Sequence, residues 1–447
     1  MTATLSRRSR AGGGTTLPGR LLLGLEPGAI ARLARRLPQG AVAVSATNGK
    51  TTTVNMAAAI YEPALRLCSN RAGANLASGV ASALLACRAS DLGVFEVDEA
   101  ALPGVAAALQ PRVVVLGNLF RDQLDRYGEL EAIGERWRTL AGRLPDTTWL
   151  VRNGDDPLVA SVGRGRQRLL SFGVDDRRAA LPAMQHAADS KWCVVCGAPY
   201  RYAAVYLGHL GDYRCDTCGD ARPRLDVRAT DVHLHGLDAS SFTLVTPHGS
   251  ARVRLPVPGL YNVYNALAAA ALACVVAPAG AGALPSLIAA GLGRFSAAFG
   301  RFERLRLGER EALLLLVKNP AGANEVVRTL TQTRRQGRVA LLALNDRIAD
   351  GRDVSWIWDV DLEPLVPTLE AVVVSGRRAA DLAVRLKYAG LEPTRMRVVP
   401  RLGAALDEVA GLGSGPVELI ATYTAMLELR AQLVARGALR PYWEEAA

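Results

Sequence analysis

The chain has 447 residues, half of them apolar, which is too long for one ordinary hydrophobic core and enough for two or three domains. Its net charge of +11 would suit nucleic acid, but the arginines are scattered among acids without blocks of like charge, so we expect no nucleic-acid partner. No apolar run reaches the roughly 20 residues that span a bilayer, so we expect a soluble protein.

The N-terminal segment is basic and low in apolar residues. Residues 1–20 contain no stretch that could form the core of a signal peptide, so we expect a flexible tail there. Residues 1–36 are predicted to be this tail and a lead-in segment. Without a secretory signal, the expected compartment is the cytoplasm, where disulfides are rare.

A phosphate-binding loop is the first motif in chain order. The apolar run at residues 41–45 predicts a strand, and residues 52–61 predict a helix. Between them, Gly49, Lys50 and Thr51 match the end of the pattern G-x-x-x-x-G-K-[ST], whereas Val44 takes the place of its first glycine. Two interpretations follow: a chance match after a strand, or a divergent phosphate-binding loop.

Further strand and helix patterns alternate after this loop. Strands are predicted at residues 92–100, 112–119 and 147–156, and their near-continuous apolar character is typical of a parallel sheet covered on both faces. Ligands bind such sheets beyond the carboxyl ends of the strands. Glu96 and Glu99 lie at one such end, where carboxylates can bind Mg²⁺, although alternation along a strand would place them on opposite faces.

Four of the seven cysteines form a metal-binding pattern. Cys193 and Cys196 make one C-x-x-C pair, Cys215 and Cys218 make a second, and a glycine follows each pair. This spacing predicts a zinc ribbon, at about residues 190–222, in which four thiolates hold a structural Zn²⁺. His209, between the pairs, is predicted to be an ordinary surface residue.

The other three cysteines do not have this metal-binding spacing. Cys68, Cys87 and Cys274 are predicted to be buried small apolar residues that form no disulfide.

After residue 300 a second α/β pattern begins, with strands at 311–320, 338–346, 369–376 and 417–424. We therefore expect a central domain at 37–300 that contains the ribbon, and a C-terminal Rossmann-like domain at 301–447.

Several segments together resemble the Mur ligase superfamily, which forms amide bonds at the expense of ATP. They are ATNGKTTT, EVDEA, GNLFRDQLDRYGE, NGDDP and PGLYNVYNALAA, in that order. The four-cysteine insertion, KNPAGANEV and DGRDVSWIWDVDLE are similar to the MurT-type ligase subunits of lipid II isoglutaminyl synthases. The resemblance runs from about Leu17 to the C-terminus.

This resemblance implies roles for individual residues. The loop residues Thr47, Asn48, Gly49, Lys50, Thr51 and Thr52 would bind ATP. One of Glu96 and Glu99 would be a Mg²⁺ ligand, and Asn262 and Asn265 match asparagines that contact adenine. A helix cap is the alternative role for these two asparagines. Ala46 and Gln123 depart from the common pattern, and Lys191 is badly placed to act as the carbamylated lysine of many relatives, which favours an amidating branch.

The implied reaction is ATP-dependent amidation of the α-carboxyl of D-glutamate in the stem peptide of lipid II. Ammonia would come from a GatD-like glutaminase partner, and lipid II would be met at the cytoplasmic membrane face. The resemblance implies an aspartate that assists the partner's Cys-His pair, for which Asp353 matches best, while Asp346, Asp350 and Asp359 compete. The alternatives are an amino-acid-adding Mur ligase, a folylpolyglutamate synthase-like ligase and a zinc-ribbon nucleic-acid-binding ATPase.

Overall fold

The computed structural model describes residues 16–70, 74–122, 130–277, 283–296, 302–333 and 337–440. These residues divide into two compact units. The first unit lies within residues 1–296, and the second within 297–447 together with residues 121–122 and 185–188. Each unit is a sheet covered by helices, so the predicted α/β class is confirmed.

The first unit contains a nine-stranded sheet in the order β11-β10-β9-β6-β5-β4-β1-β3-β2. Its strands are β1 (Ala41–Ser45), β2 (Leu67–Cys68), β3 (Leu92–Glu96), β4 (Val113–Leu116), β5 (Trp149–Asn153), β6 (Leu169–Val174), β9 (Val227–His235), β10 (Ala239–Thr246) and β11 (Gly249–Leu255). The strands from β2 to β9 in this order pair in parallel, and β10 and β11 extend the sheet antiparallel. Every residue of β1, β3 and β4 is buried, which explains their continuous apolar runs.

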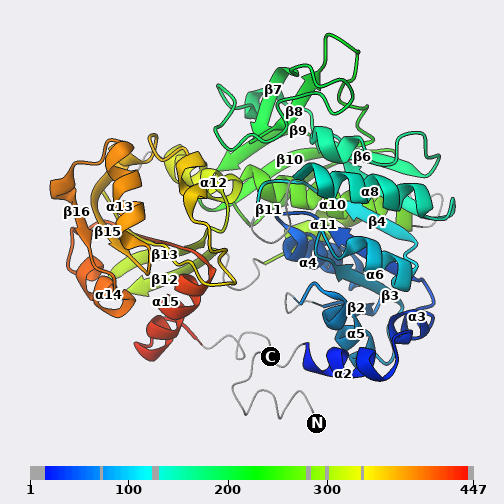
Figure 1. The fold of residues 1–447 in the computed structure, drawn as a ribbon, viewed down its shortest axis with the longest axis horizontal. Helices are drawn as coiled ribbons and strands as arrows, with labels where there is room; N and C mark the ends of the chain where they lie inside the picture. Colours follow the sequence, from blue (N-terminus) through cyan, green and yellow to red (C-terminus); the bar gives the residue numbers. More distant parts are fainter. Residues whose placement is uncertain are drawn as a thin grey trace. The chain divides into compact units, whose positions relative to one another are not determined.

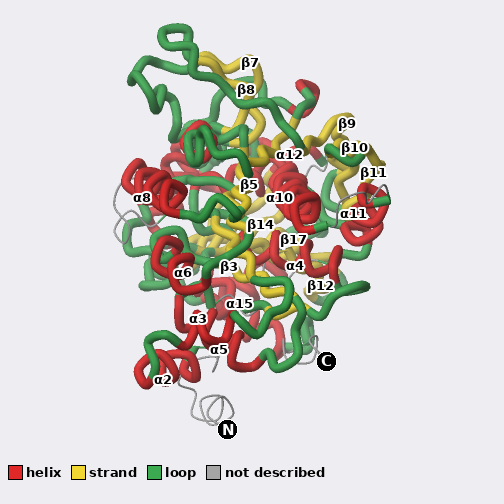
Figure 2. Tube along the Cα trace, turned by 90° about the vertical axis from the view of Figure 1, so that its right-hand side faces the viewer, coloured by secondary structure: helices red, strands yellow, loops and turns green. Residues whose placement is uncertain are grey.

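Helices cover both faces of this sheet. They are α2 (Leu17–Leu25), α3 (Ala29–Ala34), α4 (Lys50–Tyr61), α5 (Ala77–Ala86), α6 (Leu102–Leu109), α8 (Leu130–Arg143), α9 (Pro157–Ala160), η1 (Arg177–Ala179), α10 (Leu260–Val276) and α11 (Leu284–Gly293). Figure 2 shows α6 and α8 on one side of the strands and α4, α10 and α11 on the other. The phosphate-loop helix α4 therefore packs beside the alanine-rich helix α10, whose small side chains permit a close approach.

The prediction of a flexible tail at residues 1–20 is corrected in part. Leu17 to Arg20 belong to α2 rather than to a flexible tail, because Gly19 lets this helix pack closely on α5 and donates its backbone N–H to Ser82 Oγ at 2.8 Å. Residues 1–15 lie outside the described part of the chain.

Cys68 and Cys87 form a disulfide, contrary to prediction, because β2 and the end of α5 bring their Cα atoms to 5.7 Å. Cys274 is buried, as predicted.

The zinc-ribbon segment projects from the first unit between β6 and β9 (Figure 1). Its two strands, β7 (Arg201–Leu207) and β8 (Leu210–Arg214), form a separate antiparallel hairpin. Tyr200, Tyr213 and the two buried cysteines form a small apolar cluster at the base of the knuckles. The predicted insertion into the larger α/β unit is confirmed.

The second unit is built on a six-stranded sheet in the order β12-β13-β17-β14-β15-β16. Its elements are β12 (Phe302–Leu307), β13 (Arg310–Leu316), α12 (Pro320–Gln332), β14 (Arg338–Ala343), η2 (Ser355–Asp359), η3 (Val366–Thr368), β15 (Leu369–Ser375), α13 (Ala379–Tyr388), η4 (Pro393–Arg395), β16 (Met396–Val398), α14 (Leu402–Ala410), β17 (Val417–Ala421) and α15 (Tyr423–Ala435). All neighbours pair in parallel except β12 with β13. Leucine and valine side chains from α14 and α15 pack on one face of the sheet, so this unit has its own core.

Candidate functional site

The loop between β1 and α4 wraps around the start of the helix as a phosphate-binding loop does. Gly49 has φ of +89°, a left-handed conformation that favours glycine, and a Cβ there would lie 1.9 Å from Asn265 Oδ1. Asn48 donates its backbone N–H to Asn118 Oδ1 at 2.9 Å, and the Asn118 amide donates back to Asn48 O at 3.0 Å. The Asn118 side chain, which follows β4, thus fixes the loop, while α4 points its N-terminus at the carboxyl edge of the sheet.

Two carboxylates from the end of β3 contact the loop. Thr51 Oγ1 donates to Glu96 Oε2 at 2.5 Å, and Lys50 Nζ lies 2.7 Å from Glu99 Oε2. Alternation along a strand predicted that Glu96 and Glu99 lie on opposite faces, but β3 ends at Glu96, so the rule does not reach Glu99. Asp98, rather than Glu99, accepts the backbone N–H groups ahead of α6.

Asn70 fixes the backbone of Glu96 from the neighbouring chain segment. Its Oδ1 accepts the Glu96 N–H at 2.9 Å, and its Nδ2 donates to Glu96 O at 2.8 Å and to Ala74 O at 2.8 Å. Because β2 ends at Cys68, this side chain takes over the pairing that a longer strand backbone would provide. Asn70 was not singled out by the sequence, since one asparagine after a weak two-residue strand carries no distinguishing pattern.

The two asparagines of α10 lie beside the loop. The N-cap residue of this helix is Gly259, so the helix-cap alternative for Asn262 and Asn265 is wrong. Asn262 Nδ2 donates to Pro258 O at 2.7 Å, and Asn265 Nδ2 lies 3.3 Å from Asn262 Oδ1. Asn265 also lines a small cavity of about 10 Å³ next to the loop, together with Asn48 and other residues of the sheet edge.

A buried carboxylate links the ribbon to α10. Asp155, in the NGDDP segment after β5, is fully buried and accepts hydrogen bonds from Tyr264 Oη and Val174 N, both at 2.7 Å. Arg222, at the return from the ribbon, donates to the same carboxylate at 3.2 Å. Burial raises the pKa of Asp155 to about 6, although Arg222 and Tyr264 act in the opposite direction.

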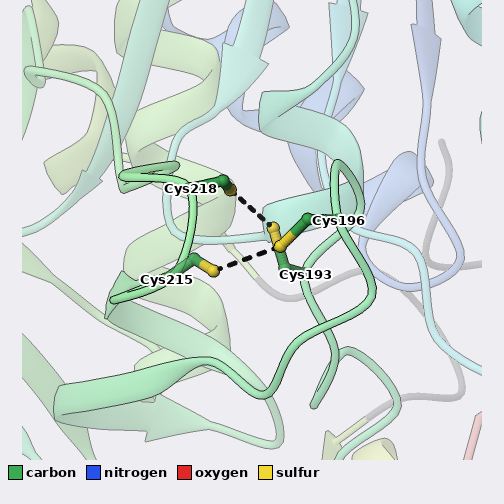
Figure 3. A group of neighbouring side chains, drawn as sticks. All are labelled: Cys193, Cys196, Cys215 and Cys218. Carbon is green, nitrogen blue, oxygen red and sulfur yellow. Dashed lines mark hydrogen bonds between the residues drawn. The ribbon is translucent and has the colours of Figure 1, made fainter.

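The four ribbon cysteines come together as predicted (Figure 3). Their sulfur atoms all lie within 4.8 Å of one another, and the pairs Cys193–Cys218 and Cys196–Cys215 are each 3.5 Å apart. Zn–S bonds of about 2.3 Å in a tetrahedron separate the sulfurs by roughly 3.8 Å, so the arrangement fits a Zn²⁺ ion. Within the described residues no other such group of His, Cys, Asp and Glu side chains occurs.

His209 is not a surface residue, contrary to prediction. It lies at the turn between β7 and β8 and is fully buried, with its ring 4.7 Å from that of Phe120. Its Nδ1 accepts the Asp189 N–H at 3.3 Å, and its Nε2 lies 3.4 Å from Asp156 Oδ2. The hairpin turn packs back on the central sheet, which the spacing of neighbouring residues does not predict.

The four candidate aspartates of the second unit have different surroundings. Asp350 is buried and accepts the Thr424 N–H at 2.7 Å, and Asp346 lies 2.7 Å from Arg377 Nε. Asp359 lies 3.5 Å from Arg121. Asp353 is exposed and accepts the Ser355 N–H at 2.8 Å, a hydrogen bond that lowers the pKa of its carboxyl.

Of Lys191 and Gln123, which set this sequence apart from many ligases, the structure describes only Lys191. Lys191 is exposed on the ribbon. Gln123 lies outside the described residues, whereas Asp122, just before it, is 2.6 Å from Lys318 Nζ. Among the helices that the structure describes, none has the length and hydropathy of a membrane-spanning segment.

Comparisons with known proteins agree with this geometry. The family model described as the Mur ligase middle domain matches residues 44–214, and the model described as MurT ligase C-terminal matches residues 316–426. Among solved structures, a pseudomurein peptide ligase type C from Methanothermus fervidus has a TM-score of 0.70 at 22% identity and covers 89% of this chain and 78% of its own. MurF from Acinetobacter baumannii has a TM-score of 0.66 at 19% identity, with 91% and 78% covered. These two likenesses show the fold.

Two curated relatives are similar along most of their length. The lipid II isoglutaminyl synthase (glutamine-hydrolyzing) subunit MurT of Streptococcus pneumoniae is 32% identical, over 97% of this chain and 95% of its own. The subunit of the same name from Staphylococcus aureus strain N315 is 30% identical, over 87% of each chain. The chain therefore belongs to the MurT family of lipid II isoglutaminyl synthase subunits, within the Mur ligases.

Proposed function

We propose that the chain is the ligase subunit that amidates the α-carboxyl of D-glutamate in the stem peptide of lipid II. The observation that carries this proposal is the similarity to the S. pneumoniae subunit along nearly the whole chain, from the phosphate-binding loop to the C-terminal unit. A glutaminase partner, GatD-like, would supply ammonia. Lipid II would be met at the cytoplasmic face of the membrane.

The loop and its surroundings fit ATP and Mg²⁺. Backbone N–H groups from Thr47 to Thr52 would contact the phosphates, Lys50 would face the β and γ oxygens, and Asn262 and Asn265 would lie near the adenine. Glu96 is the better candidate for the Mg²⁺ ligand, because it already contacts the Thr51 hydroxyl that a phosphate-binding loop offers to the ion. Glu99 would instead hold the Lys50 side chain in place. Bound Mg²⁺ would offset the negative charge of the transferring phosphoryl group.

The reaction would proceed in two steps. The glutamate carboxylate attacks the γ-phosphorus of ATP and forms an acyl phosphate with release of ADP. Ammonia then attacks the acyl carbon, the C–O bond to phosphate breaks, and the third ammonia proton leaves with hydrogen phosphate. Because little covalent chemistry is asked of the protein, positioning by the loop and charge from Lys50 would supply most of the rate enhancement.

The partner's chemistry would involve the second unit. An exposed, ionised carboxylate can orient a histidine and stabilise its charged form, as the third member of a catalytic triad does. Asp353 suits this role better than Asp350, which is buried and bound to Thr424, or Asp346, which pairs with Arg377. The ribbon cysteines would hold a structural Zn²⁺ that stabilises the knuckles.

The function is tested by co-purifying the chain with a candidate glutaminase and following the mass of lipid II with ATP and glutamine. One amide per stem peptide is expected.

Lys50→Ala should lower ammonia-dependent amidation by on the order of 100- to 1000-fold, because it removes the charge that faces the phosphoryl group. Lys387→Ala removes an exposed lysine and should have no effect. Full activity in Lys50→Ala would refute the loop assignment.

Asn70→Ala should raise the Mg²⁺ concentration at half-maximal activity by about 10- to 100-fold, as loss of a residue that orients a metal ligand does elsewhere. The reason is that Glu96 loses both backbone hydrogen bonds to the Asn70 side chain. Titration of Mg²⁺ at saturating ATP measures the effect, with the thermal midpoint as the control for folding. An equal loss of activity at every Mg²⁺ concentration would mean a merely structural role.

One Zn²⁺ per chain is expected by elemental analysis. Structural zinc is worth roughly 10 to 16 kcal/mol in small metallo-peptides, so Cys215→Ser should lose the ion and open the ribbon to proteolysis. Cys274→Ser, in α10, should retain the zinc. Purified protein without zinc, or with iron in its place, would contradict the assignment.

Asp353→Asn should keep the complex and the ammonia-dependent activity but lose most of the glutamine-dependent activity, since the amide cannot stabilise a charged imidazole. Both nitrogen sources are measured on one preparation, with Asp407→Asn, at an exposed aspartate of α14, as the matched control. Equal loss with ammonia and glutamine would place Asp353 in the ligase site. Unchanged activity with both would show that it is an ordinary loop acid.

A further inference from the structure

A half-enclosed apolar cavity lies inside the second unit, between η2, α12 and the sheet. Its volume is about 50 Å³. Among its described lining residues, only Trp356 and Thr422 bring polar side-chain atoms, and Thr422 Oγ1 already accepts the Asn345 N–H at 2.9 Å. The cavity wall is therefore almost free of groups that could hold an ion or a polar solute.

Residues from two parts of the second unit line the cavity. On one side it is lined by Trp356 and Ile357, which lie in η2 shortly after Asp353. On another side it is lined by Val317 and Thr422, the residues that directly follow β13 and β17. These strands are parallel, and their carboxyl ends form the edge at which α/β proteins bind ligands.

We propose that this cavity conducts ammonia from the Asp353 side of the second unit to the carboxyl edge of its sheet. The inference rests on the proposed function, in which a partner releases ammonia from glutamine near Asp353. It adds, within the second unit alone, one stretch of the route of the nitrogen that attacks the acyl phosphate.

The size and chemistry of the cavity suit neutral ammonia. A molecule the size of water needs about 10 to 15 Å³ of cavity volume, so this cavity of about 50 Å³ has room for a few ammonia molecules at once. An ammonium ion would lose its hydration without gaining a partner, which is costly in an apolar environment. The lining therefore favours the unprotonated form, which is the nucleophile that the second reaction step requires.

The test is to fill the cavity from its rim. Val326, on α12, lines the cavity and is half-buried, so Val326→Trp can place an indole inside it. The amide formed per glutamate released should fall by on the order of tenfold, because ammonia that escapes to water is mostly protonated near neutral pH. Ammonia-dependent amidation, glutaminase activity and complex formation should stay at the wild-type level.

Val398→Trp is the matched control, since Val398 is exposed on β16 and does not line the cavity. An unchanged ratio of amide to glutamate in Val326→Trp would overturn the proposal, as would loss of complex formation, which would make the rim a docking surface. Val326→Phe serves if the larger side chain prevents folding. Failure of the proposed function is distinguishable, because the wild-type complex would then form no amide from glutamine.

Discussion

The parallel pairing of β1 with β3 is the constraint on which the site depends. Val44 pairs with Glu96 in the register of these strands, so the loop that leaves β1 and the acids that follow β3 emerge at the same edge. Lys50 and Thr51, at the start of α4, therefore contact Glu99 and Glu96 directly. A shift of this register by one residue would turn Glu96 to the other face of the sheet.

Much of this arrangement could be predicted from local patterns. Nearly continuous apolar runs identified β1, β3, β4 and β5, because strands buried on both faces need apolar side chains at most positions. The cysteine spacing identified the ribbon, since two C-x-x-C pairs that are each followed by glycine are compatible with few structures other than a metal-binding ribbon. The G-K-T motif identified the loop, because its backbone conformation requires Gly49.

Other features depend on contacts between distant segments, which spacing does not encode. His209 is buried because the hairpin turn meets Phe120, which lies far earlier in the chain. The pairing of Cys68 with Cys87 depends on how α5 returns to β2. Asn70 acts through the backbone of Glu96, and nothing in its own neighbourhood marks it. Such roles follow only from the assembled sheet.

The buried carboxyl of Asp155 has a consequence for stability against pH. Its pKa of about 6 in the folded protein lies above the value of roughly 3.9 in an unfolded chain, so the native state holds this proton more tightly. Stability from this group is therefore full below about pH 4 and is lost as the pH rises towards 6, the reverse of an ordinary paired carboxylate. Above that range, Arg222 faces a buried anion, and the joint between ribbon and α10 becomes an internal ion pair.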